Sequence, residues 1–346
     1  MRRFQRFFGV AAPVVFAVAG INAGTASAAS QPRPLTMLDW QAEIGQVPAV
    51  GSGCFHASFP ALVWHAAACV TAPLRPFVPA SSSSRQGAPG TVGDGVDYSA
   101  VVSGLITKAT GTFADVSSKI SEKGQINASG PEDPNEFTLQ LNTEFFSGSP
   151  ACASARKPSK CQAWQQFVYE TDANIVFMQY WLIDYSATCP SGWYKYSTDC
   201  YTNSSVSTLG GQALTARSLA TVSLSGSATS GGNDQVEVIT AGQATLAAGE
   251  DTKVDLAAHW NTAEWGVYGD GGGGEAYFGK KSTLEAVTTL TATSSSAPTC
   301  VREGFTGETN NLTLAATPAL GSESSPTMAS KQTGGAAGTA SCAVAS

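Results

Sequence analysis

Three segments in the middle of the chain combine apolar positions with side-chain amides, and they predict β-strands. Residues 136–141 read Glu-Phe-Thr-Leu-Gln-Leu, residues 161–169 contain three glutamines, and residues 177–185 surround Gln179 with aromatic side chains. Aromatic and alternating runs of this length favour strands. A buried amide is costly unless it has partners, so amides among aromatic rings indicate a site in a groove. The alternative is that the glutamines occupy the wet face of an antiparallel sheet.

Similar short runs recur along the chain between breaks rich in Gly, Ser, Asn and Asp. Helix signals are sparse, and only residues 251–259 predict one short helical turn. Many short strands separated by turn residues are typical of sandwiches and barrels. We therefore predict an all-β fold, a two-sheet antiparallel sandwich of jelly-roll or concanavalin-like form, stapled by disulfides. Further strands are predicted at residues 98–105, 220–224, 235–239, 263–268, 275–278 and 284–292.

Composition divides the chain into five parts. Residues 1–28 have a basic start, an apolar stretch and the small-residue sequence Ala-Ser-Ala, which together predict a secretory signal peptide. Residues 29–79 form an N-terminal segment, and the Ser-, Gly- and Pro-rich residues 80–90 predict a flexible linker. Residues 91–314 are the predicted β-sandwich domain. Residues 315–346, rich in Ala, Gly, Ser and Thr, predict a low-complexity tail.

The cysteines agree with export. All 8 lie after the predicted cleavage site, and an even number in an exported protein indicates a set of disulfides. We therefore expect a secreted protein, extracellular or periplasmic. Proximity along the sequence favours the pairs Cys54–Cys69, Cys152–Cys161, Cys189–Cys200 and Cys300–Cys342.

Charge and histidine content argue against several classes of function. The net charge of −7 becomes −10 once the three arginines of the signal peptide are removed. Nucleic acids and anionic membranes attract basic surfaces, so neither is an expected partner. The three histidines and the cysteines lack zinc-ligand spacing, and we expect no metal and no other cofactor. No later segment predicts a membrane-spanning helix, a phosphate loop or a serine-hydrolase elbow.

Short motifs between residues 136 and 292 resemble the glutamic peptidases, namely the eqolisin and neprosin families. Cys-Gln-Ala-Trp at residues 161–164 is similar to a neprosin Glu-Ala-Gly-Trp and to an eqolisin Leu-Gln-x-Gly pattern. Residues 177–185 resemble a Tyr/Trp strand of both families, followed as in neprosins by a Cys-bounded loop. Ala-Glu-Trp at residues 263–265 resembles an eqolisin segment. Gly-Gly-Glu at residues 273–275 resembles the neprosin segment that carries a catalytic acid.

The resemblance implies endopeptidase chemistry. In those families a glutamate acts as general base on a water, and an amide donates a hydrogen bond to the oxyanion. By matching position, the resemblance implies Gln162 as the amide donor and Glu275 as the general base and acid. The eqolisin strand carries its glutamate where this chain has Tyr180 or, with a one-residue shift, Gln179, so that geometry lacks a carboxylate here. We expect the substrate to be bound by Gln140, Trp164, Tyr180 and Trp181.

Each candidate also has a plainer interpretation. Glu264 is expected to be a surface acid, and Glu275 suits a solvated acid in a glycine-rich hairpin. Gln162 suits a residue beside a disulfide loop. The alternative function is therefore a non-catalytic secreted β-sandwich, a pseudoenzyme, that binds glycan or protein. Aromatic rings near the predicted Cys189–Cys200 loop either stack on sugars or fill a small core; they are Trp193, Tyr194, Tyr196 and Tyr201.

The partner is accordingly a polypeptide substrate or a glycan, and we expect a monomer. Because related peptidases are made with propeptides, we hypothesise that residues 31–79 cover the groove and are cut in the linker. The rival interpretation is a permanent part of the fold, held by packing of Trp40 and Trp64.

Overall fold

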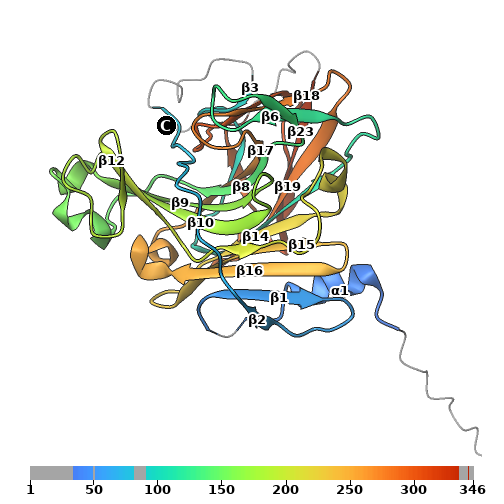
Figure 1. Cartoon of the computed structure of the whole chain (residues 1–346), viewed down its shortest axis with the longest axis horizontal. Coiled ribbons are helices and arrows are strands. Elements are labelled where there is room, and N and C mark those ends of the chain that lie inside the picture. The colour runs from blue at the N-terminus through green and yellow to red at the C-terminus, as the bar shows by residue number, and fades with distance from the viewer. Residues whose placement is uncertain (1–33, 50, 82–90, 335–341, 343–346) are drawn as a thin grey trace, which may run out of the picture. The chain divides into compact units, whose positions relative to one another are not determined.

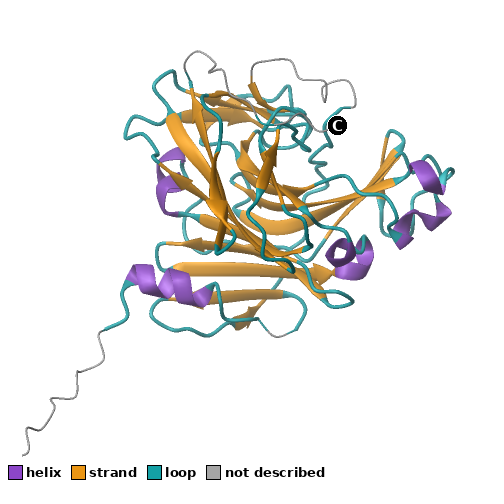
Figure 2. Cartoon of the chain, turned by 180° about the vertical axis from the view of Figure 1, so that it is seen from behind, coloured by secondary structure: helices purple, strands orange, loops and turns teal. Residues whose placement is uncertain are grey.

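The computed structural model describes residues 34–49, 51–81, 91–334 and 342. The predicted signal peptide lies outside the described residues, as does most of the predicted linker. Regular structure in the described residues is dominated by β-strands (Figure 2). Helical segments are short: the α-helix α1 (Met37–Ile44) and the 3₁₀ turns η2 (Pro150–Ser154), η3 (Pro158–Lys160), η4 (Ala216–Thr221), η5 (Asp251–Lys253) and η6 (Leu256–Ala258). The turns η5 and η6 lie where the sequence predicts a short helical turn.

The larger sheet has 14 strands. Its pairs are antiparallel apart from β18 with β21. The strands in spatial order are β2 (His65–Ala67), β1 (Cys54–Ser58), β16 (Gln243–Glu250), β15 (Asn233–Thr240), β14 (Ser223–Ser227), β5 (Ile106–Ala114), β19 (Thr283–Ala292), β23 (Ser325–Thr333), β21 (Thr309–Leu314), β18 (Glu275–Phe278), β6 (Glu122–Gln125) and β7 (Glu132–Pro134), with β22 (Ala319–Ser322) on β23 and β3 (Thr91–Gly93) on β21.

The smaller sheet has 9 strands and carries the candidate site. All of its strand pairs are antiparallel. The strands in spatial order are β11 (Tyr194–Tyr196), β12 (Asp199–Asn203), β10 (Ile175–Ile183), β9 (Gln162–Glu170), β8 (Thr138–Thr143), β17 (Thr262–Tyr268), β4 (Ser99–Val101) and β20 (Thr299–Val301), with β13 (Ser207–Thr208) on β10.

The two sheets pack face to face and enclose the main core (Figure 1). Glycines on the larger sheet leave room for rings of the smaller one. A Cβ atom on Gly111 of β5 would lie 2.0 Å from the Trp265 ring, and one on Gly226 of β14 would lie 2.5 Å from the Phe167 ring. Such a contact is far below van der Waals distance, so a larger residue at either position would force the sheets apart.

The N-terminal segment is built into the larger sheet. Strand β1 pairs with β16 from Cys54 to Ser58. Helix α1 begins at a capping box formed by Thr36 and Asp39, and it buries Trp40. After the Cys54–Cys69 disulfide, residues 73–80 cross the outer face of the smaller sheet, and we call these residues the strap. Figure 1 shows this part of the chain, coloured blue, running past β10 and β9.

The structure confirms the predicted two-sheet antiparallel sandwich and all four predicted disulfide pairs.

The predicted low-complexity tail differs from the structure. Residues 325–333 form β23, which lies between β19 and β21 and buries Met328 and Gln332. The sandwich therefore extends past residue 314. No helix in the described part of the chain has the length and hydropathy needed to cross a membrane.

Candidate active site

Polar side chains form a row across four adjacent strands of the smaller sheet. Strand pairing places Glu264 of β17 opposite Asn142 of β8, and Asn142 opposite Gln166 of β9. Gln179 of β10 lies opposite Gln166 in turn. Directly opposed residues of antiparallel strands point to the same face, so the four side chains lie side by side. All four are fully buried, and we call them the polar row.

The polar row lies on the outer face of the sheet, away from the sandwich core. Gln165, the neighbour of Gln166, points the opposite way and donates from Nε2 to Asp234 Oδ2 of the larger sheet at 3.0 Å. Residues two positions from the row share its face. Those residues include Gln140, Trp164 and Trp181, all fully buried. Amides on this face are thus flanked by aromatic rings.

Glu264 accepts several hydrogen bonds without any cation beside it in the described contacts. Its Oε2 accepts from Asn142 Nδ2 at 2.9 Å and from the backbone N–H groups of Phe305 at 2.9 Å and Thr306 at 3.3 Å. The pKa of Glu264 is raised to about 8, mainly by burial and then by the Asp97 carboxyl, although these hydrogen bonds oppose the shift. Glu264 is therefore largely protonated at neutral pH.

Tyr268 links Glu264 to a second buried carboxyl. The Tyr268 hydroxyl lies 2.6 Å from Asp97 Oδ2 and 3.3 Å from Glu264 Oε1. A phenol has one proton, and the shorter contact assigns it to Asp97. The contact with Glu264 is then favourable when Glu264 carries a proton and donates it to the phenol oxygen. Burial also raises the pKa of Asp97, to about 7, so each of these neighbouring carboxyls holds its proton more tightly than an exposed acid does.

The amides beside Glu264 retain hydrogen-bonding capacity. Gln140 Oε1 accepts from Asn142 Nδ2 at 3.4 Å and from Gln166 Nε2 at 3.3 Å. Gln140 Nε2 donates to Thr138 Oγ1 at 2.9 Å, which uses one of its two hydrogens. Asn142 Oδ1 and Gln166 Oε1 are buried without a hydrogen-bond partner. Buried amides normally have partners, so this arrangement is suited to holding a polar ligand group.

The strap is hydrogen-bonded to the Gln179 end of the polar row. Gln179 Oε1 accepts from the Phe77 N–H at 2.7 Å, and Gln179 Nε2 donates to the Arg75 carbonyl at 3.0 Å. Glu308 Oε1 accepts from the Val78 N–H at 2.9 Å. Other backbone hydrogen bonds join Gly272 to Pro76, Gly307 to Val78, and Ala80 to Phe305. The main chain of the strap is thus held as the main chain of a peptide ligand is held on a binding surface.

The structure does not bring the predicted catalytic pair together. Gln162 begins β9 of the smaller sheet, whereas Glu275 begins β18 of the larger sheet. Gln162 Nε2 donates to the Phe145 carbonyl at 3.5 Å, and Glu275 contacts Tyr277. No hydrogen bond in the described part of the chain joins the two residues. Their catalytic role stays a prediction, and the residues that the structure does assemble are different ones.

Among the predicted substrate-binding residues, Gln140, Trp164 and Trp181 share the face of the polar row. Tyr180 lies opposite Gln165 in the strand pairing and therefore points to the other face, into the sandwich core. Its hydroxyl is so close to β16 that a Cβ atom on Gly249 would lie 2.1 Å away.

Two plainer sequence interpretations are wrong. Glu264 is fully buried rather than a surface acid, because the loop at residues 303–308 returns over it. Four of the five glutamines in these segments do not face solvent: Gln140, Gln165, Gln166 and Gln179 are fully buried, whereas Gln162 is half-buried. The amide-rich strands themselves were the sequence signal for the row. Asp97 and Tyr268 lie far apart along the chain, and nothing in the sequence indicates that they meet.

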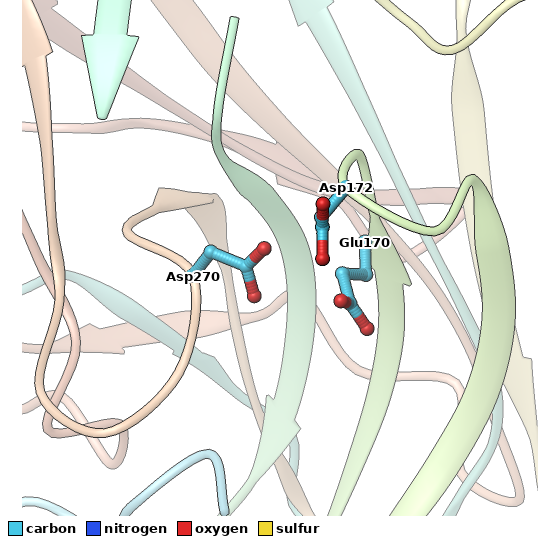
Figure 3. A group of neighbouring side chains, drawn as sticks. All are labelled: Glu170, Asp172 and Asp270. Carbon is cyan, nitrogen blue, oxygen red and sulfur yellow. The ribbon is translucent and has the colours of Figure 1, made fainter. Parts of the chain in front are cut away.

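Three carboxyls near the strap offer oxygen atoms that lie within 4.8 Å of one another, from Glu170, Asp172 and Asp270 (Figure 3). Carboxylate oxygens are the ligands that Ca²⁺ and Mg²⁺ prefer. Here, however, the guanidinium of Arg75 contacts all three groups. This cluster is therefore paired with a protein cation in the structure.

Comparison with solved structures finds a likeness to eqolisin peptidases. The structure of SCP-B, a member of the eqolisin family in complex with the tripeptide Ala-Ile-His, matches with 12% identity and a TM-score of 0.29, covering 68% of this chain and 97% of that one. Scytalido-glutamic peptidase with a peptide-based transition-state analogue matches with 11% identity and a TM-score of 0.28, at the same coverage. No protein-family model and no curated protein matches the chain.

Proposed function

We propose that this chain is a secreted endopeptidase of the glutamic type, with Glu264 as general base and acid and Gln140 as the amide that binds the oxyanion. One observation carries the proposal: a buried carboxyl, Glu264, ends a row of amides whose other end, Gln179, holds the main chain of an extended stretch of polypeptide. Gln140 lies two residues from Asn142, the strand partner of Glu264, and diagonal neighbours of this kind are about 7–8 Å apart. That spacing accommodates one water between the two side chains.

The proposed reaction follows from the hydrogen bonds. Ionised Glu264 takes a proton from water, and the resulting hydroxide attacks the carbonyl carbon of the peptide bond. The free hydrogen of Gln140 Nε2 stabilises the oxyanion as it forms. Protonated Glu264 then gives its proton to the leaving nitrogen, the C–N bond breaks, and Glu264 returns to its ionised state. Asn142 and the backbone N–H groups of Phe305 and Thr306 hold Oε2 in place throughout.

The strap occupies the surface that a substrate would need, so the described state is a covered one. The disulfide in the N-terminal segment joins Cys54 to Cys69, both within that segment. One cut in residues 81–90 would therefore leave no covalent link between residues 35–80 and the sandwich. This supports the hypothesis that the N-terminal segment is a propeptide. Before cleavage, the pairing of β1 with β16 and the burial of Trp40 hold this segment on the sandwich.

The test is hydrolysis of denatured casein by protein cut in the linker. Glu264→Gln is nearly isosteric and should lower the rate by roughly 10²–10⁴-fold, the usual contribution of a general acid–base group. Glu275→Gln is the matched variant, and its rate should stay near that of the parent. If Glu275→Gln loses casein hydrolysis and Glu264→Gln retains it, the predicted catalytic pair Gln162 and Glu275 would be supported instead. Circular dichroism of both variants shows whether the fold is kept.

A binding module is the second candidate, because part of the aromatic cluster is exposed. Tyr194 and Tyr196 on the edge strand β11 are 44% and 40% exposed. They pack against Tyr201 and Trp181, which fixes their orientation. Rings held in this way suit stacking on sugars. A glycan array would separate the two candidates. Glycan binding that is lost in Tyr194→Ala and Tyr196→Ala would favour the binding module, provided that the protein does not hydrolyse casein.

A further inference from the structure

Four carboxyl groups meet at one end of the smaller sheet, and we call them the acidic cluster. Glu170 ends β9 and Asp172 follows in the turn, whereas Glu136 precedes β8 and Asp270 follows β17. The register explains the meeting, because Thr138 at the start of β8 pairs with both Glu170 and Tyr268. Figure 3 shows Asp270 on one side and Glu170 and Asp172 together on the other.

One guanidinium fills the acidic cluster. Arg75 Nη1 lies 2.7 Å from Asp270 Oδ1, and Arg75 Nη2 lies 2.9 Å from Asp172 Oδ2 and 3.1 Å from Glu170 Oε1. The Arg75 side chain is 14% exposed, and those of Glu170 and Asp270 are 0% exposed. Although burial lowers the pKa of Arg75, the carboxylates of Asp270 and Glu170 outweigh it and raise that pKa, so the guanidinium stays charged.

The cluster holds more acid than one guanidinium balances. Burial, followed by the neighbouring carboxylates, raises the pKa of Glu170 to about 8. Glu136 shares a hydrogen bond with Asp270, and burial raises its pKa to about 9. Both oxygens of Glu170 and both of Asp270 are buried, and Arg75 is the cation that contacts each carboxyl among the described residues. Buried carboxyls without a cation are costly, so this end of the sheet is organised around a positively charged group.

The strap presents Arg75 as a peptide ligand presents an anchor residue. Its main chain is held by Gln179, Glu308 and backbone groups of the body, and such contacts do not depend on the sequence of the strap. Side-chain recognition is concentrated at Arg75 and, two residues later, at Phe77, which is fully buried against Val168, Ile175, Phe177 and Val206. A different extended peptide can therefore take the same path if it supplies a matching cation.

We propose that the acidic cluster is a subsite for the arginine side chain of a polypeptide ligand, and that Arg75 occupies it until the strap leaves. The proposal deepens the proposed function, because it names arginine-containing polypeptides as the substrate class. The planar guanidinium matches two carboxylates at once, so arginine fits better than lysine. The strap runs from Gln179 toward Phe305, which contacts Glu264. A ligand in the same direction therefore carries its arginine on the amino-terminal side of the bond cleaved.

Binding is tested with the full chain carrying Arg75→Ala in a Glu264→Gln background, so that no turnover is needed. The probes are two labelled hexapeptides, Pro-Leu-Arg-Pro-Phe-Val and the same sequence with citrulline, which has the shape of arginine without its charge. We expect the arginine peptide to bind at least about 30-fold more tightly, the usual loss when one partner of a buried charge pair is removed. Adding Asp270→Asn, which replaces the carboxyl nearest to the Arg75 guanidinium, should reduce this preference to about threefold or less.

The control is Asp184→Asn, an exposed carboxyl outside the acidic cluster, which should leave the preference unchanged. If Arg75→Ala does not fold, Arg75→Lys gives a weakened strap for the same measurement. Equal affinity for the two peptides would overturn the proposal, as would Ca²⁺ binding to the Arg75→Ala protein without an arginine preference. Arginine-selective binding without any hydrolysis by the cut parent protein would instead refute the peptidase function and leave the subsite standing.

Discussion

At the scale of single residues, the site depends on where a proton resides. Glu264, Tyr268 and Asp97 form a chain of contacts with one phenol proton between two carboxyls. Interacting carboxyls titrate as a pair, so the two apparent pKa values belong jointly to Glu264 and Asp97. The Asp97 carboxyl beside Glu264 raises the pKa of Glu264, so Glu264 loses its proton less readily than an isolated glutamate. This arrangement keeps a proton available for the leaving group at pH values where an ordinary glutamate has lost it.

The pH profile of the uncovered protein should report this coupling. A general base must be ionised, so we expect kcat/KM to fall about tenfold per pH unit below the pKa of Glu264. That pKa is about 8 in the covered state, where burial beneath the loop at residues 303–308 is its main cause, and contact with water should lower it. The maximum should therefore lie on the acid side of pH 8. Asp97→Asn removes the neighbouring charge and should move the acid limb lower by about one unit.

Asp184→Asn is the matched control for that profile, since it removes an exposed carboxyl elsewhere. An acid limb that stays in place when Asp97 is replaced, or that moves equally in the control, would contradict the assignment of Glu264 as the base.

The sequence predicts only in part which face of the sheet each side chain of the site occupies. Of the predicted substrate-binding residues, Gln140, Trp164 and Trp181 share one face of the sheet, which depends on the register of three different strands. Tyr180 was grouped with them although it is adjacent to Trp181, and adjacent residues point to opposite faces. Glu264 was misjudged for a different reason, since the loop that buries it comes from about 40 residues later in the chain. Burial caused by distant segments leaves no local pattern.

At the scale of elements, the agreement is uneven. The predicted strand at residues 98–105 runs past β4, which ends at Val101, and residues 220–221 of the predicted strand 220–224 lie in η4. Other predicted strands match. Residues 275–278 match β18, and residues 161–169 match β9 within one residue at each end. Strand β23 was missed because Ser325–Thr333 consists mainly of small and polar residues. Backbone pairing with β19 and β21 makes this segment a strand, although its side chains show no strand pattern. Propensity is a weak guide where tertiary pairing decides.

The strap makes a prediction at this scale. Replacing residues 83–87 with a recognition sequence for a specific protease allows one cut between the strap and the sandwich. A tethered segment competes at an effective concentration of about millimolar, so cutting should raise hydrolysis of a dilute peptide by roughly tenfold or more once the segment dissociates. Phe77→Asp, which places a charge in an apolar cluster, should raise the rate in the uncut protein as well.

Size-exclusion chromatography after cutting shows whether residues 35–80 remain bound. A control protein with Leu320→Asp, at a position 45% exposed, should behave as the parent does. Full activity of intact protein, with an N-terminus near residue 29 and the strap in place, would exclude a covering role for the N-terminal segment.

At the scale of the whole molecule, the unusual feature is the number of buried carboxyls that favour the protonated form. Burial is the largest cause of a raised pKa at Asp97, Glu122, Glu136, Glu144, Glu170, Asp234, Glu264 and Glu308, with values of about 7 to about 9. They lie in both sheets and in the loops between them. Burial therefore favours the neutral form of these carboxyl groups, and the low share of charged residues, 13%, makes them more prominent.

These shifts predict a protein that is most stable in acid. A carboxyl whose pKa is higher in the folded state than in the unfolded chain holds its proton more tightly when folded. Its stabilising contribution is complete below the unfolded pKa and is lost as the pH rises through the folded value. Stability is therefore lost over the pH range from about 4.5 to about 9. We expect the Tm to fall by on the order of 10 °C between pH 4 and pH 9.

Glu122 provides the sharpest variant for this prediction, because it lies on β6, is 6% exposed, and has two carboxyl oxygens without a hydrogen-bond partner. Glu122→Gln keeps the shape and removes the charge that appears above about pH 9. It should leave the Tm at pH 4 nearly unchanged and raise the Tm at pH 9 by a few degrees. The fall in Tm between these pH values should therefore be smaller than in the parent. The exposed Glu323→Gln is the matched control and should change neither value. Thermal unfolding followed by circular dichroism at both pH values decides the matter, and a Tm that rises from pH 4 to pH 9 would show that the buried carboxyls are ionised and paired instead.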